Sequence, residues 1–245
     1  MSTAAIPVHV ALVDMSGKVS STELAKVAGA LNEQVQADVA PAWKLAATVG
    51  AYPESPAGTW RIELHETIPE RGAAGIHLDE HGQPYSLIAL ADGEWTVSTS
   101  HELIEMLVDP FARRLHTAKL LDGWSGPEAP TRVRYLLEPC DPCERVTYEV
   151  GGVPVSDFVL PKFYRSSGTE SGEGYSHLGS VSKPLEVLDG GYISFFSASK
   201  LYQRFVEAGH TKDVAIEPEA TGPEGSQLSL REIADRHAEA HRRSA

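Results

Sequence analysis

The segment that most constrains the fold is residues 98–110, which read Ser-Thr-Ser-His-Glu-Leu-Ile-Glu-Met-Leu-Val-Asp-Pro. An α-helix turns by about 100° per residue, so His101, Glu105 and Asp109 would share an arc of about 80°, with Glu102 about 100° from His101. Leucine and methionine side chains fill the opposite face, which predicts a helix packed on a core. Acidic side chains on one arc repel one another, so either water screens them or a cation neutralises them.

Composition narrows the class of protein. The 245 residues include 42% hydrophobic and 22% charged residues, as in an ordinary soluble globular protein. A formal net charge of -13 argues against binding to nucleic acid or to anionic membranes, because both require a positive surface. The sequence has no apolar run of about 18 residues, so we expect no transmembrane segment. The first residues lack the basic region of a signal peptide, and two cysteines agree with a reducing compartment, so the expected location is cytoplasmic.

The first half of the chain alternates strand and helix signals. A helix should begin near Ser21, because Ser20 and Glu23 form a capping-box pattern. Gly and Pro residues predict a loop between residues 69 and 82, in which His77 would be a surface histidine that could also line a cleft. The predicted strands are 8–13, 59–64 and 85–90, with the last at a sheet edge, and the His101 helix should end at Asp109, before Pro110.

The second half is richer in turns than in helices. Gly151 and Gly152 predict a hairpin between strands 146–150 and 153–155. A second hairpin is predicted around residues 189–191, flanked by 185–188 and 192–196, and residues 132–137 form another candidate strand. A short helix is predicted at 198–208 and a final one from Ser229. The expected fold class is therefore α+β.

His101 and Glu105 are candidate metal ligands. They stand four residues apart, so both can reach one ion from the same helix face, as the two histidines of His-Glu-x-x-His do. Glu102 would then lie where a general base is needed. The alternative is a solvated helix face, on which Glu102 only caps the helix start together with Thr99.

These residues carry a resemblance to a known group of proteins. The segment from Ser100 to Pro110 resembles the Ser-His-Glu-x-x-Glu-x-x-x-Asp-Pro motif of zincin-like proteins that have glutamate in place of the second histidine (HExxE). Exordium-like (phosphate-induced) proteins and uncharacterised bacterial and phage-encoded proteins carry similar motifs. Downstream, the segment from Glu138 to Cys143 is similar to the Glu-x-x-Asp-x-Cys segment of those proteins. The segment Val155–Phe158, with Pro161 and Phe163, is similar to the bacterial group.

The resemblance implies a zincin-like fold: a mixed sheet with an active-site helix in an N-terminal subdomain at 1–118, and a loop- and hairpin-rich subdomain at 119–245 that completes a cleft. It implies a metal-dependent hydrolase, namely a peptidase that acts on peptide or protein substrates, with Glu102 as the general base. Zinc is the expected ion. Because one histidine and carboxylates form a harder donor set, manganese or iron is an alternative. The third ligand is expected to be Glu138 or Asp141, with Asp109 and Glu144 as further candidates.

Departures from the familiar motifs keep other functions open. Metzincins require a glycine and a further ligand where this chain has Val108 and Phe111, and the methionines are Met1, Met15 and Met106 alone, which leaves no downstream Met-turn. A non-catalytic binding or structural module is therefore an alternative, as is a biosynthetic metalloenzyme of oxidative or lyase chemistry. Cys140 and Cys143 cannot form a four-cysteine zinc site, and we expect a local structural role or a disulfide from them.

Overall fold

The computed structural model describes residues 7–69, 73–80, 82–111, 113–124, 130–165, 174–197 and 200–216. The chain divides into two compact units. The first contains the chain up to Pro110 together with Thr147–Ser156, and the second contains Phe111–Val146 and the chain from Asp157 onward. The sequence-based subdomains at 1–118 and 119–245 stay a prediction. The structure places the segment Thr147–Ser156 within the first unit.

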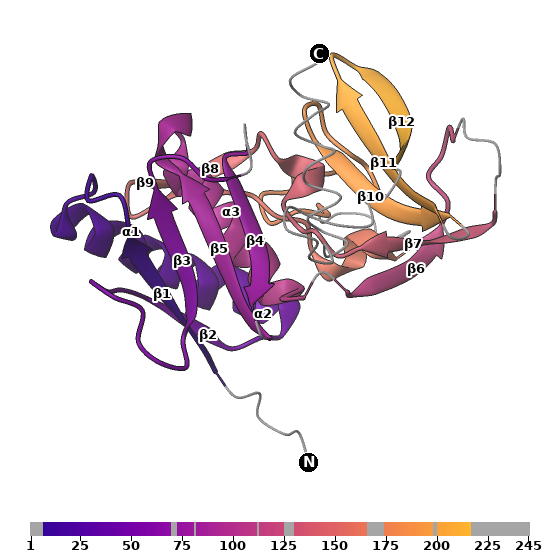
Figure 1. Cartoon of the computed structure of the whole chain (residues 1–245). Coiled ribbons are helices and arrows are strands. Elements are labelled where there is room, and N and C mark those ends of the chain that lie inside the picture. The colour runs from indigo at the N-terminus through magenta and orange to yellow at the C-terminus, as the bar shows by residue number, and fades with distance from the viewer. Residues whose placement is uncertain are drawn as a thin grey trace. The chain divides into compact units, whose positions relative to one another are not determined.

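The first unit is built on a mixed five-stranded sheet with the order β2-β1-β3-β5-β4 (Figure 1). β1, β2, β3 and β5 pair in parallel, and β4 pairs with β5 in antiparallel orientation. The α+β class predicted from sequence is confirmed. The strands are β1 (Val8–Asp14), β2 (Ala47–Ala51), β3 (Trp60–His65), β4 (Gly75–Glu80) and β5 (Gln83–Ala89).

Strand β4 corrects two predictions. Residues 75–80 form a strand, where a loop was predicted, and the turn that follows joins it to β5 in a hairpin. β5 is therefore paired on both sides, with β3 and with β4, and is not an edge strand. The edges of this sheet are β2 and β4.

The first helix, α1 (Ser21–Gln34), begins as predicted. Ser20 accepts a hydrogen bond from the Glu23 amide at 3.1 Å, which satisfies one of the free N–H groups of the first turn. The helix continues through a π-helical segment, η1 (Val35–Val39), into the short helix α2 (Ala40–Trp43). Pro41 is tolerated because it stands in the first turn of α2, where an N–H would be unsatisfied in any case.

The candidate site helix, α3 (Trp95–Val108), follows the 3-10 turn η2 (Leu90–Asp92). It begins four residues before Thr99, whose hydroxyl donates to the Trp95 carbonyl at 2.6 Å inside the helix. The suggested capping pair of Thr99 and Glu102 is therefore wrong. The helix ends at Val108 with Asp109 as its C-cap, as predicted from Pro110.

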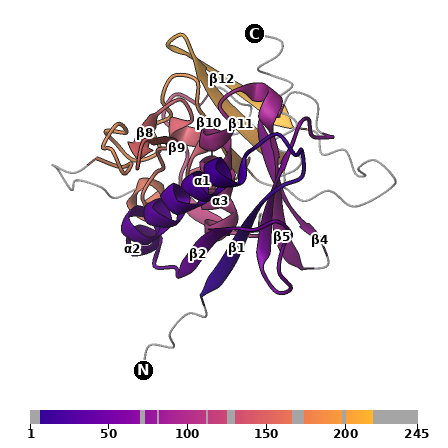
Figure 2. The same ribbon diagram turned by 90° about the vertical axis from the view of Figure 1, so that its left-hand side faces the viewer.

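Helices α1 and α3 lie on the same face of the first sheet (Figures 1 and 2). Leu24 and Leu31 of α1 and Leu103 and Met106 of α3 share one core with buried residues of the strands. The hairpin β8 (Thr147–Val150) and β9 (Val153–Ser156) packs along α3 and adds to this core. Its turn is the predicted Gly151-Gly152 pair, and both glycines have positive φ.

The second unit contains an antiparallel five-stranded sheet with the order β12-β11-β10-β7-β6. The short helices η3 (Asp141–Cys143) and η4 (Pro161–Tyr164) also belong to this unit. Its strands are β6 (Leu115–Lys119), β7 (Arg132–Leu136), β10 (Tyr192–Ser197), β11 (Lys200–Glu207) and β12 (His210–Ile216).

Two predictions for this half are wrong. Residues 200–207 form strand β11, where a helix was predicted, and residues 185–188 do not form a strand, so β10 pairs with β11 and β7 instead. The final predicted helix from Ser229 lies outside the described residues. Within the part of the chain that the structure describes, no helix is long and apolar enough to cross a membrane, and the cytoplasmic location stays a prediction.

Candidate metal centre

Helix α3 carries two carboxylates that are buried. The side chain of Glu102 is 8% exposed and that of Glu105 is 0% exposed. The residues stand three apart, so their side chains leave the same side of the helix. The interpretation of this helix face as a solvated surface is therefore wrong. Asp109, at the helix end, is also buried.

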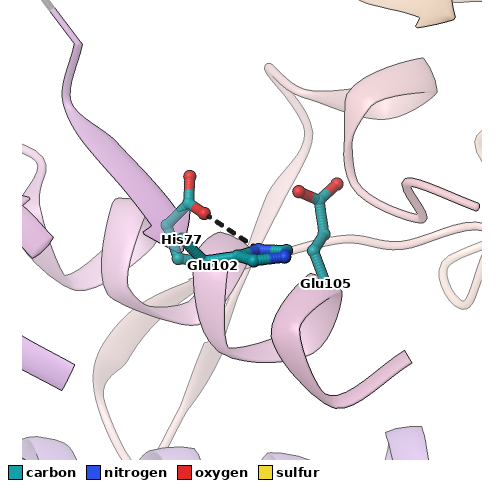
Figure 3. Close-up of side chains that lie close together, drawn as sticks. All are labelled: His77, Glu102 and Glu105. Atoms are coloured by element: carbon teal, nitrogen blue, oxygen red, sulfur yellow. Dashed lines mark ion pairs between the residues drawn. The ribbon is translucent and has the colours of Figure 1, made fainter. Parts of the chain in front are cut away.

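His77 of strand β4 joins these two glutamates. Its Nδ1 lies 3.5 Å from Glu102 Oε2, and the side chain is 1% exposed. One potential ligand atom from each of His77, Glu102 and Glu105 lies within 4.8 Å of the other two. Figure 3 shows the imidazole ring between the two carboxylates, both of which rise from α3. His77 is thus a buried member of the site and not a surface histidine.

The second ring nitrogen of His77 is held by the backbone. Nε2 lies 3.3 Å from the carbonyl oxygen of Asp109. A carbonyl oxygen can only accept a hydrogen bond, so Nε2 must carry the hydrogen. In the neutral ring, this tautomer leaves the lone pair on Nδ1, the atom that faces Glu102.

His101 and Glu105 lie together, as their spacing predicted. His101 Nε2 is 3.3 Å from Glu105 Oε2, and the histidine side chain is 13% exposed. The carboxylate of Glu105 therefore has a histidine of its own helix beside it and a histidine of β4 within 4.8 Å. A carboxylate has two oxygens, and each of them can act as a donor to a cation.

A buried hydrogen-bond network fixes the side of α3 that faces α1 and β9. The Ser100 hydroxyl donates to Gln34 Oε1 at 2.8 Å and accepts from the Ser156 amide at 3.0 Å. Gln34 in turn donates to the Ser156 carbonyl at 3.0 Å and to the Tyr148 hydroxyl at 3.2 Å. Because Ser100 directly precedes His101, this network sets the rotation of the helix that presents the site.

The donor set fits a divalent ion. One oxygen of Glu102 and one of Glu105 lie within 4.8 Å of each other. At an effective dielectric constant of about 20, two unit charges at that limit repel by about 3.5 kcal/mol, and burial adds a desolvation cost to each. A bound cation would offset both terms. Imidazole nitrogen and carboxylate oxygen are donors that zinc, manganese and iron accept. Of the five predicted site residues, His101, Glu102 and Glu105 stand at this centre.

Glu138 and Asp141 belong to the second unit, where both are buried. Asp141 begins η3, and the Glu138 carbonyl accepts a hydrogen bond from the Tyr164 hydroxyl at 3.0 Å. That either residue completes the metal site stays a prediction. Cys140 and Cys143 are buried in the same segment and form no disulfide, and their local structural role stays a prediction.

His77 is the site residue that sequence reasoning missed. Its strand, Gly-Ile-His-Leu-Asp-Glu, is short and lies among turn-forming residues, so the loop signal dominated. A signal was nevertheless present. The segment Ile76–Leu78 places one polar residue between two apolar ones, which is the period-two pattern of a strand, and a turn and the strand Gln83–Ala89 follow it.

Comparison of the chain with family models, with curated proteins and with solved structures gives no match.

Proposed function

We propose that this protein is a metal-dependent hydrolase with a zincin-like arrangement, in which α3 is the active-site helix. The observation that supports this most strongly is the burial of Glu102 and Glu105 with a histidine beside each carboxylate. Buried carboxylates are retained where they are paired or bind metal, because an isolated buried charge is costly. Titratable groups that are buried and clustered in this way are candidates for a functional site.

The proposed roles are ion binding and proton transfer. His101 and Glu105 hold the ion, and the third ligand expected from the sequence is Glu138 or Asp141. Zinc is the expected ion, with manganese or iron as alternatives. The bound ion would supply Lewis acidity, which polarises a scissile carbonyl and acidifies water. Glu102 accepts the proton from the attacking water and delivers it to the leaving group.

The proposed substrate is a peptide or protein. An extended peptide can pair with a free strand edge by β-augmentation, and specificity then comes from alternate side chains. β5 is excluded from this role because both of its edges are paired. The edge next to the site is β4, the strand that carries His77.

A non-catalytic binding module is the second candidate. The replacement of the usual second histidine by Glu105 favours it, because a carboxylate ligand changes both metal affinity and Lewis acidity. Under this alternative the protein would keep the fold as a binding or structural module and would not turn over substrate.

The test is metal content together with hydrolysis of a peptide library by the full chain. Elemental mass spectrometry should find bound metal in the wild type. The ion held by His101 and Glu105 should be lost in His101→Ala and in Glu105→Gln. Glu102→Gln should keep the ion held by His101 and Glu105, and its rate of hydrolysis should fall by at least about 100-fold, as expected for removal of a general base. Metal without hydrolysis in the wild type would favour the binding module. A wild type without metal, even after zinc, manganese and iron are supplied, would overturn the hydrolase and favour the binding module.

A further inference from the structure

We propose that the first unit has a second cation position, formed by Nδ1 of His77 and the carboxylates of Glu102 and Glu105. It lies beside the position between His101 and Glu105 and shares Glu105 with it. All three ligands come from one compact unit. The binding itself is independent of the proposed hydrolase. One consequence, inhibition by the second ion, rests on the proposed function.

The first argument is the tautomer of His77. Metal-binding histidines almost always donate their other ring N–H to a carboxylate or a backbone carbonyl, which orients the ring and leaves the ligating nitrogen unprotonated. His77 has this arrangement: Nε2 faces the Asp109 carbonyl at 3.3 Å, and Nδ1 faces the glutamates. If the ring is neutral, two groups that can only accept, Nδ1 and a charged Glu102 carboxylate, face each other, and a cation between them resolves this conflict.

The second argument is distance. Metal–ligand bonds of about 2.1 Å in a tetrahedral arrangement place neighbouring donor atoms about 3.4 Å apart. The separation between His77 Nδ1 and Glu102 Oε2 is 3.5 Å, and that between His101 Nε2 and Glu105 Oε2 is 3.3 Å. Each pair therefore already has the spacing of two ligands on one ion. Glu105 connects the two pairs because its carboxylate has two oxygens.

Occupation of the second position would affect Glu102 directly. A carboxylate that ligates a cation is a weaker proton acceptor, because the cation stabilises its charged form. If Glu102 is the general base, an excess of metal should inhibit hydrolysis, and removal of His77 should relieve that inhibition. The site would thus limit activity at high metal concentration.

The experiment is a titration of metal-free protein with Zn²⁺ by calorimetry, for the wild type, His77→Asn, His101→Ala and a control, His65→Asn. His65 lies on β3 of the same sheet, 3.2 Å from Glu63, so the control also removes a histidine beside a glutamate. We expect the wild type and the control to bind two ions. His77→Asn should lose one of them, with its affinity reduced by at least about 100-fold. His101→Ala should keep the His77-dependent ion.

A second readout protects the test against misfolding, since His77 is buried. Nitrogen-15 spectra of the histidine side chains of the wild-type protein should show the Nε2–H tautomer for His77 and a large shift of Nδ1 when Zn²⁺ is added. The same Zn²⁺ affinity and stoichiometry in folded His77→Asn, or an unchanged Nδ1 resonance, would overturn the proposal. A single ion lost in both His77→Asn and His101→Ala would overturn the two positions and indicate one shared site.

The outcomes separate this inference from the proposed function. If His101→Ala loses one ion and His77→Asn binds as the wild type does, the second position is refuted and the hydrolase proposal is unaffected. If the wild type binds two ions but hydrolyses no peptide, the second position is supported and the hydrolase proposal is refuted.

Discussion

Gly75 of β4 lies directly against Glu102 of α3. A Cβ atom built on Gly75 would stand 2.7 Å from Glu102 Cγ and 3.2 Å from its Oε1. At these distances the Glu102 side chain would have to move to make room for a Cβ atom. The absence of a side chain at residue 75 therefore makes room for the buried glutamate, two residues before His77 on the same strand.

We expect Gly75→Ala to displace Glu102 and weaken the metal centre. The added methyl group also meets Ile88 Cδ1 at 3.0 Å, so the cost of overpacking should be about 1–3 kcal/mol in the free energy of unfolding. Zn²⁺ calorimetry should show a reduced affinity at the position that uses Glu102. Urea unfolding of the metal-free protein measures the stability term separately.

Gly29→Ala is the matched control. Gly29 lies on the exposed side of α1, and nothing stands within 4 Å of a Cβ placed there. The substitution should raise stability by about 0.5–1 kcal/mol, because alanine favours a helix interior, and should leave metal binding unchanged. Equal metal affinities in Gly75→Ala and Gly29→Ala would contradict the close packing of Gly75 on Glu102.

The sequence predicts α3 well because its apolar residues repeat with helical period over several turns and Pro110 marks its end. The start was misplaced because Thr99 looks like a cap. Its hydroxyl is instead bonded to the carbonyl four residues earlier, a geometry that a threonine inside a helix can adopt. The proximity of His101 and Glu105 followed from spacing alone.

His77 could not be placed in the site from local pattern. Its partner Glu102 is 25 residues away, and the two meet only because β4 folds back on β5 at the sheet edge. β2, with the sequence Ala-Thr-Val-Gly-Ala, was missed for a related reason. Its own strand propensity is weak, and parallel pairing with β1 recruits it.

The predicted helix at 198–208 shows how a turn overrides a periodic pattern. Leu201, Tyr202, Phe205 and Val206 match a helical repeat, but tyrosine, phenylalanine and valine also favour strands. Ala208 and Gly209 both have positive φ, as a two-residue hairpin turn requires, and they join β11 to β12. Antiparallel pairing over the whole length of β11 then decides its structure.

Ser100→Ala should loosen the contact between α3 and the β8–β9 hairpin. It removes the donor to Gln34 and the acceptor for the buried Ser156 amide, which should lower the free energy of unfolding by about 1–3 kcal/mol. Hydrogen exchange of the Ser156 amide gives the specific measurement and should become faster. In Ser98→Ala, a control on the same helix, that amide should exchange as in the wild type.

The second unit contains a buried ion pair that can be tested independently. Arg204 of β11 donates to both oxygens of Asp213 of β12, at 2.6 and 2.8 Å, and both side chains are under a tenth exposed. Asp213→Ala leaves a buried guanidinium without its carboxylate, so we expect the free energy of unfolding to fall by about 3–5 kcal/mol. Trp124 packs on Phe195 and Tyr202 in this unit, so its fluorescence reports the unfolding.

Asp122→Ala is the control for this pair. It removes the same chemical group from an exposed contact with Lys119, where the aspartate side chain is 86% exposed. Exposed ion pairs contribute little to stability, so the free energy of unfolding should change by no more than about 0.5 kcal/mol. A loss for Asp213→Ala no larger than that of the control would show that the buried pair does not stabilise the sheet.

Asp14, at the end of β1, should make the first unit sensitive to acid. Burial raises the pKa of its carboxyl group, but hydrogen bonds from the Ser16 hydroxyl and from the amides of Val19, Ser16 and Gly17 outweigh this, and the net pKa is lowered below 3.8. In acid the unfolded state therefore binds the proton more readily than the folded state. The stabilisation is fully present above the unfolded pKa of 3.8 and is lost as the pH falls through the folded value.

Urea unfolding from pH 6 to pH 2.5 measures this contribution. Asp14→Asn should be less stable than the wild type near pH 6, and the difference should shrink toward pH 2.5, because the wild-type carboxyl group loses its charge as the pH falls through its folded pKa. Asp79→Asn removes the same charge from an exposed position on β4, so it controls for the change in net charge. The amide of Val19, which donates to Asp14 at 2.9 Å, should exchange faster in Asp14→Asn alone. The same pH profile in both variants would mean that the loop between β1 and α1 does not depend on the Asp14 carboxylate.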